Sequence, residues 1–279
     1  MLYLYHSTTS VCAIKVRLTL DEKGLAYDGK LLNLRDGEQH EPEYVKLNPN
    51  HVVPTLIHDG KVVVESTLII EYLDEVFADP PLMPADPYTR AIARLWMKKI
   101  DDYLHAACST LTFAIIFSPV FARKTPPERD AYFAAMPNAT YRERQRLSVE
   151  QGLDAPHVPA ATRAYDKYIG EMETALATLP YLAGQTYSLA DAAATPYIFR
   201  AEMLGLNKLW VGKRPGVEDW CARIRERPSF AHAIDSWLTD VDRARYAAIN
   251  EEPYSKIVRI LGPAGEKNPL GHTHTANNR

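Results

Sequence analysis

Ser10 and Cys12 place a hydroxyl and a thiol two residues apart, near the start of the first predicted helix. Free backbone N–H groups and the helix dipole favour an anion at this position, and Lys15 adds a positive charge close by. A serine here can cap the helix or hydrogen-bond to a bound anion. A cysteine here can pack as a small apolar residue, or its pKa can fall so that it attacks disulfides and thioethers. This stretch alone leaves both interpretations open for both residues.

The three cysteines limit this chemistry. Cys12, Cys108 and Cys221 are far apart and odd in number, which argues against a disulfide framework and for a reducing compartment. We therefore expect a cytoplasmic protein. Cys108 and Cys221 lie in helical patterns and are predicted to pack, and the chain has no Cys-x-x-Cys pair. Single-cysteine chemistry at Cys12 is the form of thiol chemistry that remains.

The stretch from Asn48 to Leu56 suggests a site of another kind. Pro54 stands at the entrance to a strand-like run, where a residue without a backbone N–H normally weakens a sheet. If the Val53–Pro54 bond is cis, the N–H and carbonyl of Val53 turn outward as an unpaired edge for an extended peptide ligand. The alternative is an ordinary trans proline at a strand start, which is commoner for such a dipeptide.

Hydrophobic patterns around these residues predict a small α/β domain. Strand-like runs at Leu2–Tyr5 and Tyr27–Leu34 flank a helix that ends at Lys23-Gly24, which is typical of a right-handed βαβ unit with parallel strands. A strand at Thr55–His58 leads into the hairpin turn Asp59-Gly60. The other predicted elements are a short helix, a return strand and a final helix, at Pro42–Leu47, Val62–Val64 and Leu68–Phe77.

The rest of the chain is predicted to be helical. The proline-rich stretch Ala78–Pro87 marks a domain boundary, which predicts a first domain at residues 1–80, a linker at 81–87 and a helical domain at 88–261. Ser188 and Asp191 have the spacing of a capping box at the start of a buried helix. Residues 118–160 contain charged helical pieces separated by many prolines, without one regular pattern. Residues 262–279 lack an apolar period and are predicted to be disordered.

Composition argues against several classes of function. The net charge of −3 and the interspersed charges offer no basic surface for nucleic acid. The N-terminus does not resemble a signal peptide, and the apolar window Leu111–Ala122, broken by Ser118-Pro119, is too short for the about 20 residues that span a bilayer. The histidines lack the spacing of zinc sites, and no phosphate loop is present. We expect a soluble protein without metal, membrane or nucleic-acid partners.

With this order of elements, the chain resembles the cytosolic glutathione transferases. The matching residues are Val53-Pro54-Thr55-Leu56, Glu65-Ser66 and Ser188-Leu189-Ala190-Asp191, and the resemblance extends from Leu2 to about Leu238. It implies an α/β N-terminal thioredoxin-like domain that binds glutathione, plus an all-α C-terminal domain that completes a second-substrate pocket. It also implies a homodimer and a cis Val53–Pro54 bond.

Different stretches resemble different classes of the family. Ser10-Val11-Cys12-Ala13 is similar to the Ser-x-Cys-Ser start of the active-site helix in zeta-class transferases and glutathione-dependent reductive dehalogenases, although Ala13 departs from it. In contrast, Glu38-Gln39-His40, Glu65-Ser66-Thr67 and Asp86-Pro87-Tyr88 resemble bacterial transferases that cleave β-aryl ether bonds. The sequence therefore leaves the reaction type open.

The resemblance implies a set of glutathione-binding residues. Ser66, at a helix start, would bind the γ-glutamyl carboxylate, and Glu65 would take the α-ammonium group. Polar side chains beside the backbone edge would meet the glycine carboxylate. The predicted glutathione-binding residues are His40, Asn50, His51, Val53, Pro54, Glu65 and Ser66.

Activation of the glutathione thiol requires only a small stabilisation of the thiolate by the protein. Lowering a thiol pKa by about two units takes roughly 2.7 kcal/mol, and a hydrogen bond to a charged group supplies about 1.5 to 3 kcal/mol. One hydroxyl is therefore enough. Ser10 matches the catalytic serine of the zeta pattern, and Tyr5 is a rival because some classes use a tyrosine there. Cys12 supports a second hypothesis, a thiol transferase or reductive dehalogenase, and a non-catalytic binding protein of the same fold is a third.

The second substrate is expected between the domains. Tyr103, Phe113 and Phe117 are the candidate lining residues. Aromatic residues near them favour an apolar, aromatic electrophile, and the alternative is that they belong to the core. The leading hypothesis is a glutathione S-transferase that serves detoxification, with Ser10 as the catalytic residue and glutathione as cosubstrate. Conjugation and β-aryl ether cleavage are the favoured reactions, with isomerisation and dehalogenation as alternatives.

Overall fold

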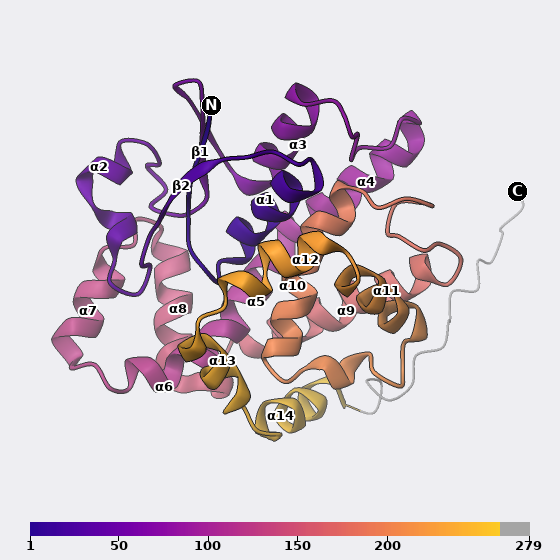
Figure 1. Cartoon of the computed structure of the whole chain (residues 1–279). Coiled ribbons are helices and arrows are strands. Elements are labelled where there is room, and N and C mark those ends of the chain that lie inside the picture. The colour runs from indigo at the N-terminus through magenta and orange to yellow at the C-terminus, as the bar shows by residue number, and fades with distance from the viewer. Residues whose placement is uncertain (263–279) are drawn as a thin grey trace, which may run out of the picture.

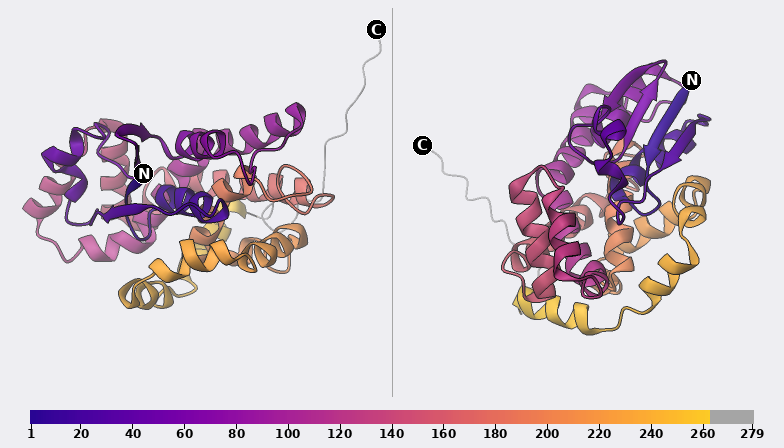
Figure 2. Two further views of the ribbon diagram at one scale, coloured as in Figure 1. Left: turned by 45° about the horizontal axis from the view of Figure 1, so that its top comes forward. Right: turned by 90° about the vertical axis from the view of Figure 1, so that its left-hand side faces the viewer.

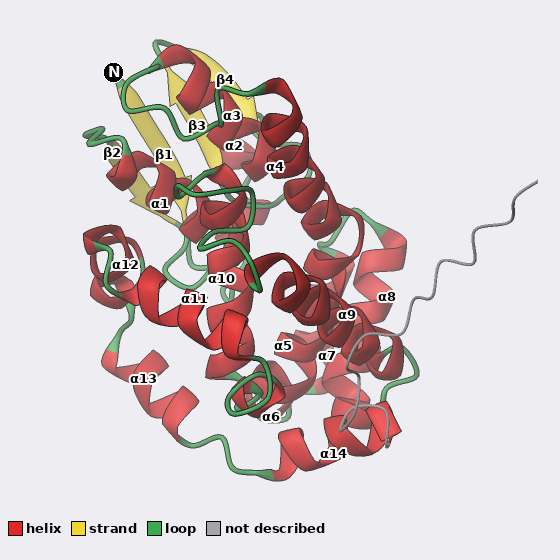
Figure 3. Cartoon of the chain, turned by 90° about the vertical axis from the view of Figure 1, so that its right-hand side faces the viewer, coloured by secondary structure: helices red, strands yellow, loops and turns green. Residues whose placement is uncertain are grey.

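A computed structural model describes residues 1–262 of the chain (Figure 1). The chain folds into a small sheet with helices against it, followed by a larger group of helices, as the colours of Figure 3 show. This architecture confirms the predicted fold class, an α/β part followed by an all-α part. The predicted disorder of residues 262–279 lies, apart from Gly262, outside the described residues.

Four strands form a mixed sheet in the order β2-β1-β3-β4. β1 and β2 pair in parallel, whereas β1 with β3 and β3 with β4 are antiparallel. Asp59 and Gly60, which connect β3 to β4, have φ angles of 48° and 78°, and two positive φ angles are typical of a type I′ hairpin turn. The strands are β1 (Leu2–His6), β2 (Asp28–Leu31), β3 (Thr55–His58) and β4 (Lys61–Val64).

The helix α1 (Val11–Glu22) lies between the two parts. It packs against α3 (Ser66–Val76) on one side and against α10 (Leu189–Met203) and α12 (Pro228–Ala233) on the other. Every residue from Ala13 to Leu20 is buried for this reason. The N-terminus of α1 is thereby held at the boundary between the parts.

The proline-rich connection is tied to the first part by a buried ion pair. Lys23 Nζ lies 2.7 Å from Asp74 Oδ1 and donates to the Pro80 carbonyl at 2.7 Å. The Asp74 carboxylate also accepts from the Leu82 and Met83 N–H groups. These bonds set the direction in which the chain enters the helical part.

The first helices of the second part form one continuous run of 35 residues. By length and composition this run could cross a membrane, but 56% of its most apolar window is buried within the fold. The expected break at Ser118-Pro119 was wrong. A π-helical turn precedes these two residues, and in it the Ser118 N–H donates to the Phe113 carbonyl. The α-helical hydrogen-bond pattern is therefore already interrupted at the point where Pro119 lacks an N–H, so the proline does not end the helix. The segments are α4 (Pro87–Lys99), a π turn (Ile100–Leu104), α5 (His105–Thr112), a π turn (Phe113–Phe117) and α6 (Ser118–Phe121).

The remaining helices pack around this run and around α10. The stretch without a regular pattern folds into helices whose aromatic side chains, Phe121, Tyr132 and Phe133, contact one another. Figure 2 (right) shows the sheet at one end of the molecule and α13 and α14 at the other. The remaining segments are α2 (Pro42–Val45), α7 (Pro126–Ala134), α8 (Ala139–Gln151), α9 (Val158–Leu176), α11 (Pro215–Arg225), α13 (Asp240–Ala247) and α14 (Glu252–Leu261).

The predicted capping box at the start of α10 is part of a buried network. Asp191 is fully buried, and its carboxylate accepts from the Ser188 N–H and hydroxyl, the Leu182 N–H and the Trp220 indole at 2.9 to 3.0 Å. Burial raises the pKa of Asp191, against the opposing effect of these donors. One carboxylate thus joins α10, α11 and the chain before α10.

Candidate functional site

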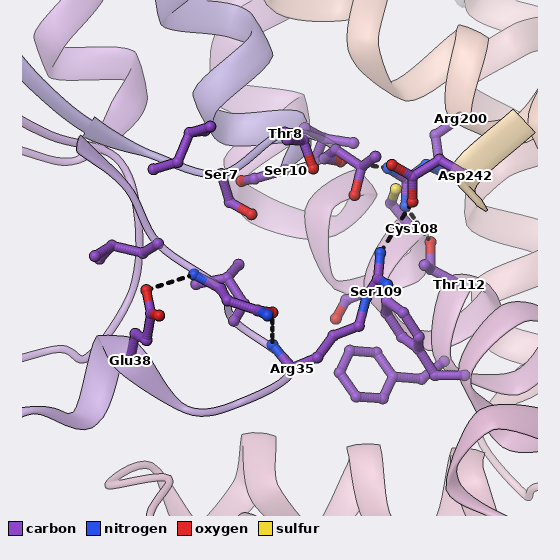
Figure 4. Close-up of a pocket in the computed structure, with 18 of the residues that line it drawn as sticks. Ser7, Thr8, Ser10, Arg35, Glu38, Cys108, Ser109, Thr112, Arg200 and Asp242 are labelled. Carbon is purple, nitrogen blue, oxygen red and sulfur yellow. Dashed lines mark hydrogen bonds and ion pairs between the residues drawn. The ribbon is translucent and has the colours of Figure 1, made fainter. Parts of the chain in front are cut away.

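Ser10 occupies the N-cap of α1. Its backbone is extended, with φ −66° and ψ 120°, and its Oγ accepts from the Ala13 N–H at 3.3 Å. Within residues 1–262 no acceptor takes the Ser10 hydroxyl hydrogen, and the residue lines a cleft (Figure 4). Ser10 can therefore cap the helix and still donate a hydrogen bond to an anion in the cleft.

The loop before Ser10 is held by two arginines. Arg17, on α1, donates to the carbonyls of Ser7 and Thr8 at 3.0 and 2.8 Å, and also to the Ala233 carbonyl of α12. Arg200, on α10, donates to the Thr9 carbonyl. Three successive carbonyls are thus fixed, which leaves the backbone little freedom to move Ser10.

Tyr5, the rival of Ser10, lies elsewhere. Its ring packs against Tyr44 at a centroid distance of 5.4 Å, in a cluster that also contains Val53. Leu4, whose side chain alternates with Tyr5 along β1, belongs instead to the core that contains α1. Tyr5 does not line the cleft that contains Ser10.

Cys12 is half-buried and contacts the second part. Its sulfur lies 3.6 Å from His105 Nδ1 and 3.7 Å from the Tyr197 hydroxyl. Burial alone would raise the pKa of the Cys12 thiol, but the charge and hydrogen bond of His105, with the charge of Lys15 and a hydrogen bond from Ser66, lower it to about 6. The thiolate in turn raises the pKa of His105. Cys12 and His105 are therefore placed to form a thiolate–imidazolium pair.

Lys15 extends this pair toward α3. Its side chain is fully buried, and its Nζ donates to Thr67 Oγ1 at 2.8 Å and lies 3.8 Å from Asp101. Thr67 in turn donates to Asp101 at 3.0 Å. The cation is thus anchored beside the starts of both α1 and α3, where it favours an anion at either helix.

The proline edge has the form that the resemblance implied. The Val53–Pro54 bond is cis. Tyr44 and Asn48 donate to the carbonyl of Val52 at 2.5 and 2.9 Å, which fixes the approach to this bond. In the described part of the chain no group hydrogen-bonds to the backbone of Val53. An extended peptide can therefore pair with this residue.

Glu65 and Ser66 lie beside this edge. Thr55 pairs with Val64 across β3 and β4, which brings Pro54 next to Glu65. Glu65 has a φ of 67°, in the left-handed region, and such backbone strain costs about 1 to 3 kcal/mol for a residue other than glycine. Ser66 is buried and begins α3. The strand register and the strained turn thus place both residues near the chain at Val53–Pro54.

The other predicted residues form two hydrogen-bonded contacts, one of which reaches Glu65. Asn50 Nδ2 donates to Glu65 Oε1 at 3.3 Å, and His40 Nδ1 lies 3.0 Å from His51 Nδ1. Burial, followed by the charge of His51, lowers the pKa of His40, and its Nε2 is bonded to Gln39. Both ring nitrogens of His40 thus have partners, and a carboxylate would have to displace one of them.

A cleft of about 450 Å³ lies between the two parts, next to Ser10. One wall is the loop before α1 and the chain after β2, and the other includes α5, the following π turn and α8. Phe113 and Phe117, both predicted, line it and pack edge to face at 4.9 Å. Its polar lining consists of Asn33, Arg35, Glu38, His105, Ser109, Thr112, Tyr141, Arg200, Thr239 and Asp242, besides the residues of the loop before α1.

Tyr103 does not line this cleft, contrary to the prediction. It lies in the π turn before α5, and its ring faces α9, where it contacts Tyr168 edge to face at 6.4 Å. Its hydroxyl donates to Glu171 at 3.4 Å, and burial with the charge of Glu171 raises its pKa. The aromatic pattern that suggested a substrate pocket therefore includes one residue of the packing between helices.

Sequence reasoning missed several charged residues of the cleft. Arg200 lies in the alanine-rich helix α10, where a lone cation among buried apolar residues was the available signal. Arg35 and Asp242 come from the two ends of the chain and form an ion pair of 2.9 Å across the cleft. No local pattern could have paired them.

Comparison with known proteins agrees with this geometry. The family model "Glutathione S-transferase, N-terminal domain" matches residues 9–76, and "Glutathione S-transferase, C-terminal domain" matches residues 142–223. A tetrachloro-p-hydroquinone reductive dehalogenase of Sphingobium chlorophenolicum is 32% identical over 84% of this chain and 96% of that protein. The chain belongs to the glutathione S-transferase family. It is an enzyme of this family, and glutathione is its cosubstrate.

Other relatives of this transferase carry different names and activities. Protein LigF of Sphingobium sp. strain SYK-6 is 30% identical over 84% of this chain and 93% of LigF. Its crystal structure, described as a beta-etherase, matches with a TM-score of 0.76 over 84% of this chain and 99% of that one. The glutathione S-transferase TCHQD of Arabidopsis thaliana is 27% identical over 84% of this chain and 90% of that protein. Both classes that the sequence resembled are therefore represented among its relatives.

Proposed function

We propose that this transferase uses Ser10 to stabilise the thiolate of glutathione for attack on an apolar, aromatic electrophile. The observation that carries the proposal is the free hydroxyl of Ser10 at the start of α1, beside a cleft with the aromatic side chains of Phe113 and Phe117. The thiolate forms a carbon–sulfur bond, and the leaving group departs with the electron pair of the bond that breaks. A halide leaves in conjugation, and a phenolate in β-aryl ether cleavage.

The experiment is the pH dependence of turnover with an aromatic halide, for the wild type, Ser10→Ala and Ser10→Thr. Loss of one hydrogen bond to the thiolate is worth about 1.5 to 3 kcal/mol, so kcat/KM of Ser10→Ala falls about ten- to hundredfold at neutral pH. Its profile also shifts to higher pH, because the bound thiol ionises less readily. Ser10→Thr retains the hydroxyl and most of the rate. Equal rates and profiles for all three proteins would reject the role of Ser10.

The glutathione site of the proposal comprises the backbone edge and the turn beside it. Val53, after which the cis Pro54 follows, offers main-chain pairing, and the start of α3 at Ser66 suits the γ-glutamyl carboxylate. The Glu65 carboxylate accepts a hydrogen bond from the α-ammonium group. His51 and Asn50, with His40 behind them, are assigned to the glycine carboxylate because they border the same edge.

A second candidate function is glutathione-dependent thiol transfer at Cys12, which the 3.6 Å contact with His105 favours. In this reaction the Cys12 thiolate attacks the glutathionyl sulfur of a mixed disulfide, and the substrate leaves as a thiolate that takes a proton. A second glutathione then releases the enzyme thiol and forms oxidised glutathione. Mass spectrometry after incubation with oxidised glutathione should locate the adduct on Cys12. An adduct confined to Cys108 or Cys221 would reject this function.

We further propose a cytoplasmic homodimer. Apolar side chains are exposed on the adjacent helices α3 and α4, with Leu68 59%, Tyr88 75% and Leu95 49% exposed. An ion pair between Glu71 and Arg94 joins these two helices into one surface. The three cysteines are free thiols, which fits a reducing compartment.

A further inference from the structure

Arg200 is a buried cation that lines the cleft without a carboxylate partner. Only 6% of its surface is exposed, yet it lines the cleft, beside Thr112 of α5 (Figure 4). Its guanidinium donates to the Thr9 carbonyl and, at 3.5 Å, to Thr112 Oγ1. Its Nε is buried without an acceptor, and in residues 1–262 no acid lies within ion-pair distance of it. The guanidinium is therefore contacted by neutral groups, two oxygens and the ring of Tyr246 at 5.9 Å.

The nearest acid of the cleft is already engaged. The Asp242 carboxylate binds Arg35 at 2.9 Å and Arg245 at 3.2 Å, and it accepts from the Thr239 hydroxyl at 2.7 Å. It lowers the local potential but offers no direct contact to Arg200. A buried cation without a paired anion is costly, and contacts to neutral groups leave the charge of Arg200 unneutralised, so an anion in the cleft would gain from it.

We propose that Arg200 binds an oxyanion carried on the ring of the second substrate, so that the preferred electrophile is an aromatic carboxylate or phenolate. This inference rests on the proposed transferase function. A guanidinium has the planar fork that matches such oxygens, and the rings of Phe113, Phe117 and Tyr141 line the same cleft. The bond to Thr9, the neighbour of Ser10, places the cation beside the loop that carries the proposed catalytic serine. The cleft would thus hold the ring with its anionic oxygen at α10.

The test measures binding of four matched ligands by calorimetry to the full chain saturated with glutathione. 4-Nitrobenzoate and 4-nitrophenolate carry the oxyanion, and methyl 4-nitrobenzoate and 4-nitroanisole are their neutral counterparts. At a pH where both acids are ionised, each anion is expected to bind about ten- to hundredfold more tightly than its neutral counterpart. If only one of the two anions is preferred, the site binds that class of oxyanion, a carboxylate or a phenolate. A ratio near one for both pairs overturns the inference.

Three variants assign the preference to Arg200. Arg200→Met removes the charge at similar length and should bring both ratios close to one, even if all four ligands bind more weakly through loss of the Thr9 contact. Arg200→Lys should retain part of the preference. Arg35→Gln is the control, since Arg35 is paired with Asp242, and it should retain most of the preference. Ratios lost in Arg35→Gln but kept in Arg200→Met would overturn the assignment.

The test of Arg200 can fail while the proposed transferase function holds, and the two failures can be distinguished. If Arg200→Met fails to fold, the wild type and Arg200→Lys still test the inference. An affinity ratio that is unchanged in Arg200→Lys but lost in Arg35→Gln contradicts it. Turnover of a neutral aromatic halide is measured on the same samples. Normal turnover without anion preference rejects only the role of Arg200. Failure to bind glutathione rejects the proposed function, and the ligand ratios can then be measured in its absence.

Discussion

The sulfur of Cys12 lies 3.6 Å from Nδ1 of His105, so a thiol of the first part and an imidazole of the second part form one pair. His105 also lines the cleft that contains Ser10, whereas Cys12 does not. The two candidate catalytic residues therefore meet different surroundings, although they are two positions apart in one helix. His105 is the side chain through which they can influence each other.

Replacement of His105 by Gln should raise the pKa of Cys12 above the value of about 6 that the pair produces. With the imidazolium gone, burial dominates and the thiol stays protonated at neutral pH. Alkylation of Cys12 at pH 7, followed peptide by peptide with mass spectrometry, should slow by about tenfold or more. In the wild type the rate should be half-maximal near pH 6. His232→Gln, at an exposed histidine, is the control, and an equal profile for both variants would contradict the pair.

Replacement of Glu65 by Gly should separate binding from stability. Glycine adopts the φ of 67° without strain, so the free energy of unfolding should not fall despite the loss of a side chain. Glutathione affinity, measured by calorimetry, should fall about tenfold or more if Glu65 takes the α-ammonium group. Glu75→Gly in the same region, inside α3, should instead lose roughly 1 kcal/mol of stability and keep its affinity. Unchanged affinity in Glu65→Gly would exclude this residue from the ligand contacts.

Removal of the Asp191 carboxylate should weaken the whole helical part. Asp191→Ala leaves the Leu182 N–H, the Ser188 N–H and the Trp220 indole buried without acceptors, at about 1 to 3 kcal/mol each. The free energy of unfolding in urea should therefore fall by at least about 3 kcal/mol. Asp219→Ala, at an exposed position of α11, should change it by less than about 0.5 kcal/mol. Similar values for the two variants would show that the network is not a stabilising one.

Introduction of a charge on the exposed face of α3 should dissociate the proposed dimer. Leu68→Arg places a cation where 59% of the leucine is exposed in the single chain, and sedimentation velocity should then detect a monomer. Val241→Arg, at a valine that is 62% exposed on α13, is the matched control and should stay dimeric. A wild-type protein that sediments as a monomer would reject the dimer, and a dimer that survives Leu68→Arg would place the interface elsewhere.

The features that the sequence could predict are local ones. The cap at Ser10, the hairpin turn at Asp59-Gly60 and the box at Ser188 each depend on neighbours within a few positions, and the structure has all three. The cis form of Val53–Pro54 followed from the family resemblance rather than from the dipeptide.

The features that the sequence could not predict depend on contacts between distant residues. Tyr103 was assigned to the cleft because it is aromatic, but its orientation follows from Glu171 and Tyr168, which lie far along the chain. The ion pair between Arg35 and Asp242 joins residues 207 positions apart. Periodicity shows which face of a helix is apolar, and it does not show which neighbour that face will meet.

Arg17 and Arg200 hold three successive carbonyls, so the conformation of the loop before Ser10 depends on both parts of the molecule. The first part carries every residue assigned to glutathione, yet the Thr9 carbonyl gains its partner only when α10 is docked. A fragment consisting of the first part alone could therefore bind the tripeptide and still misplace Ser10. In this enzyme, the first part would recognise the ligand before the two parts assemble, and catalysis would require their assembly.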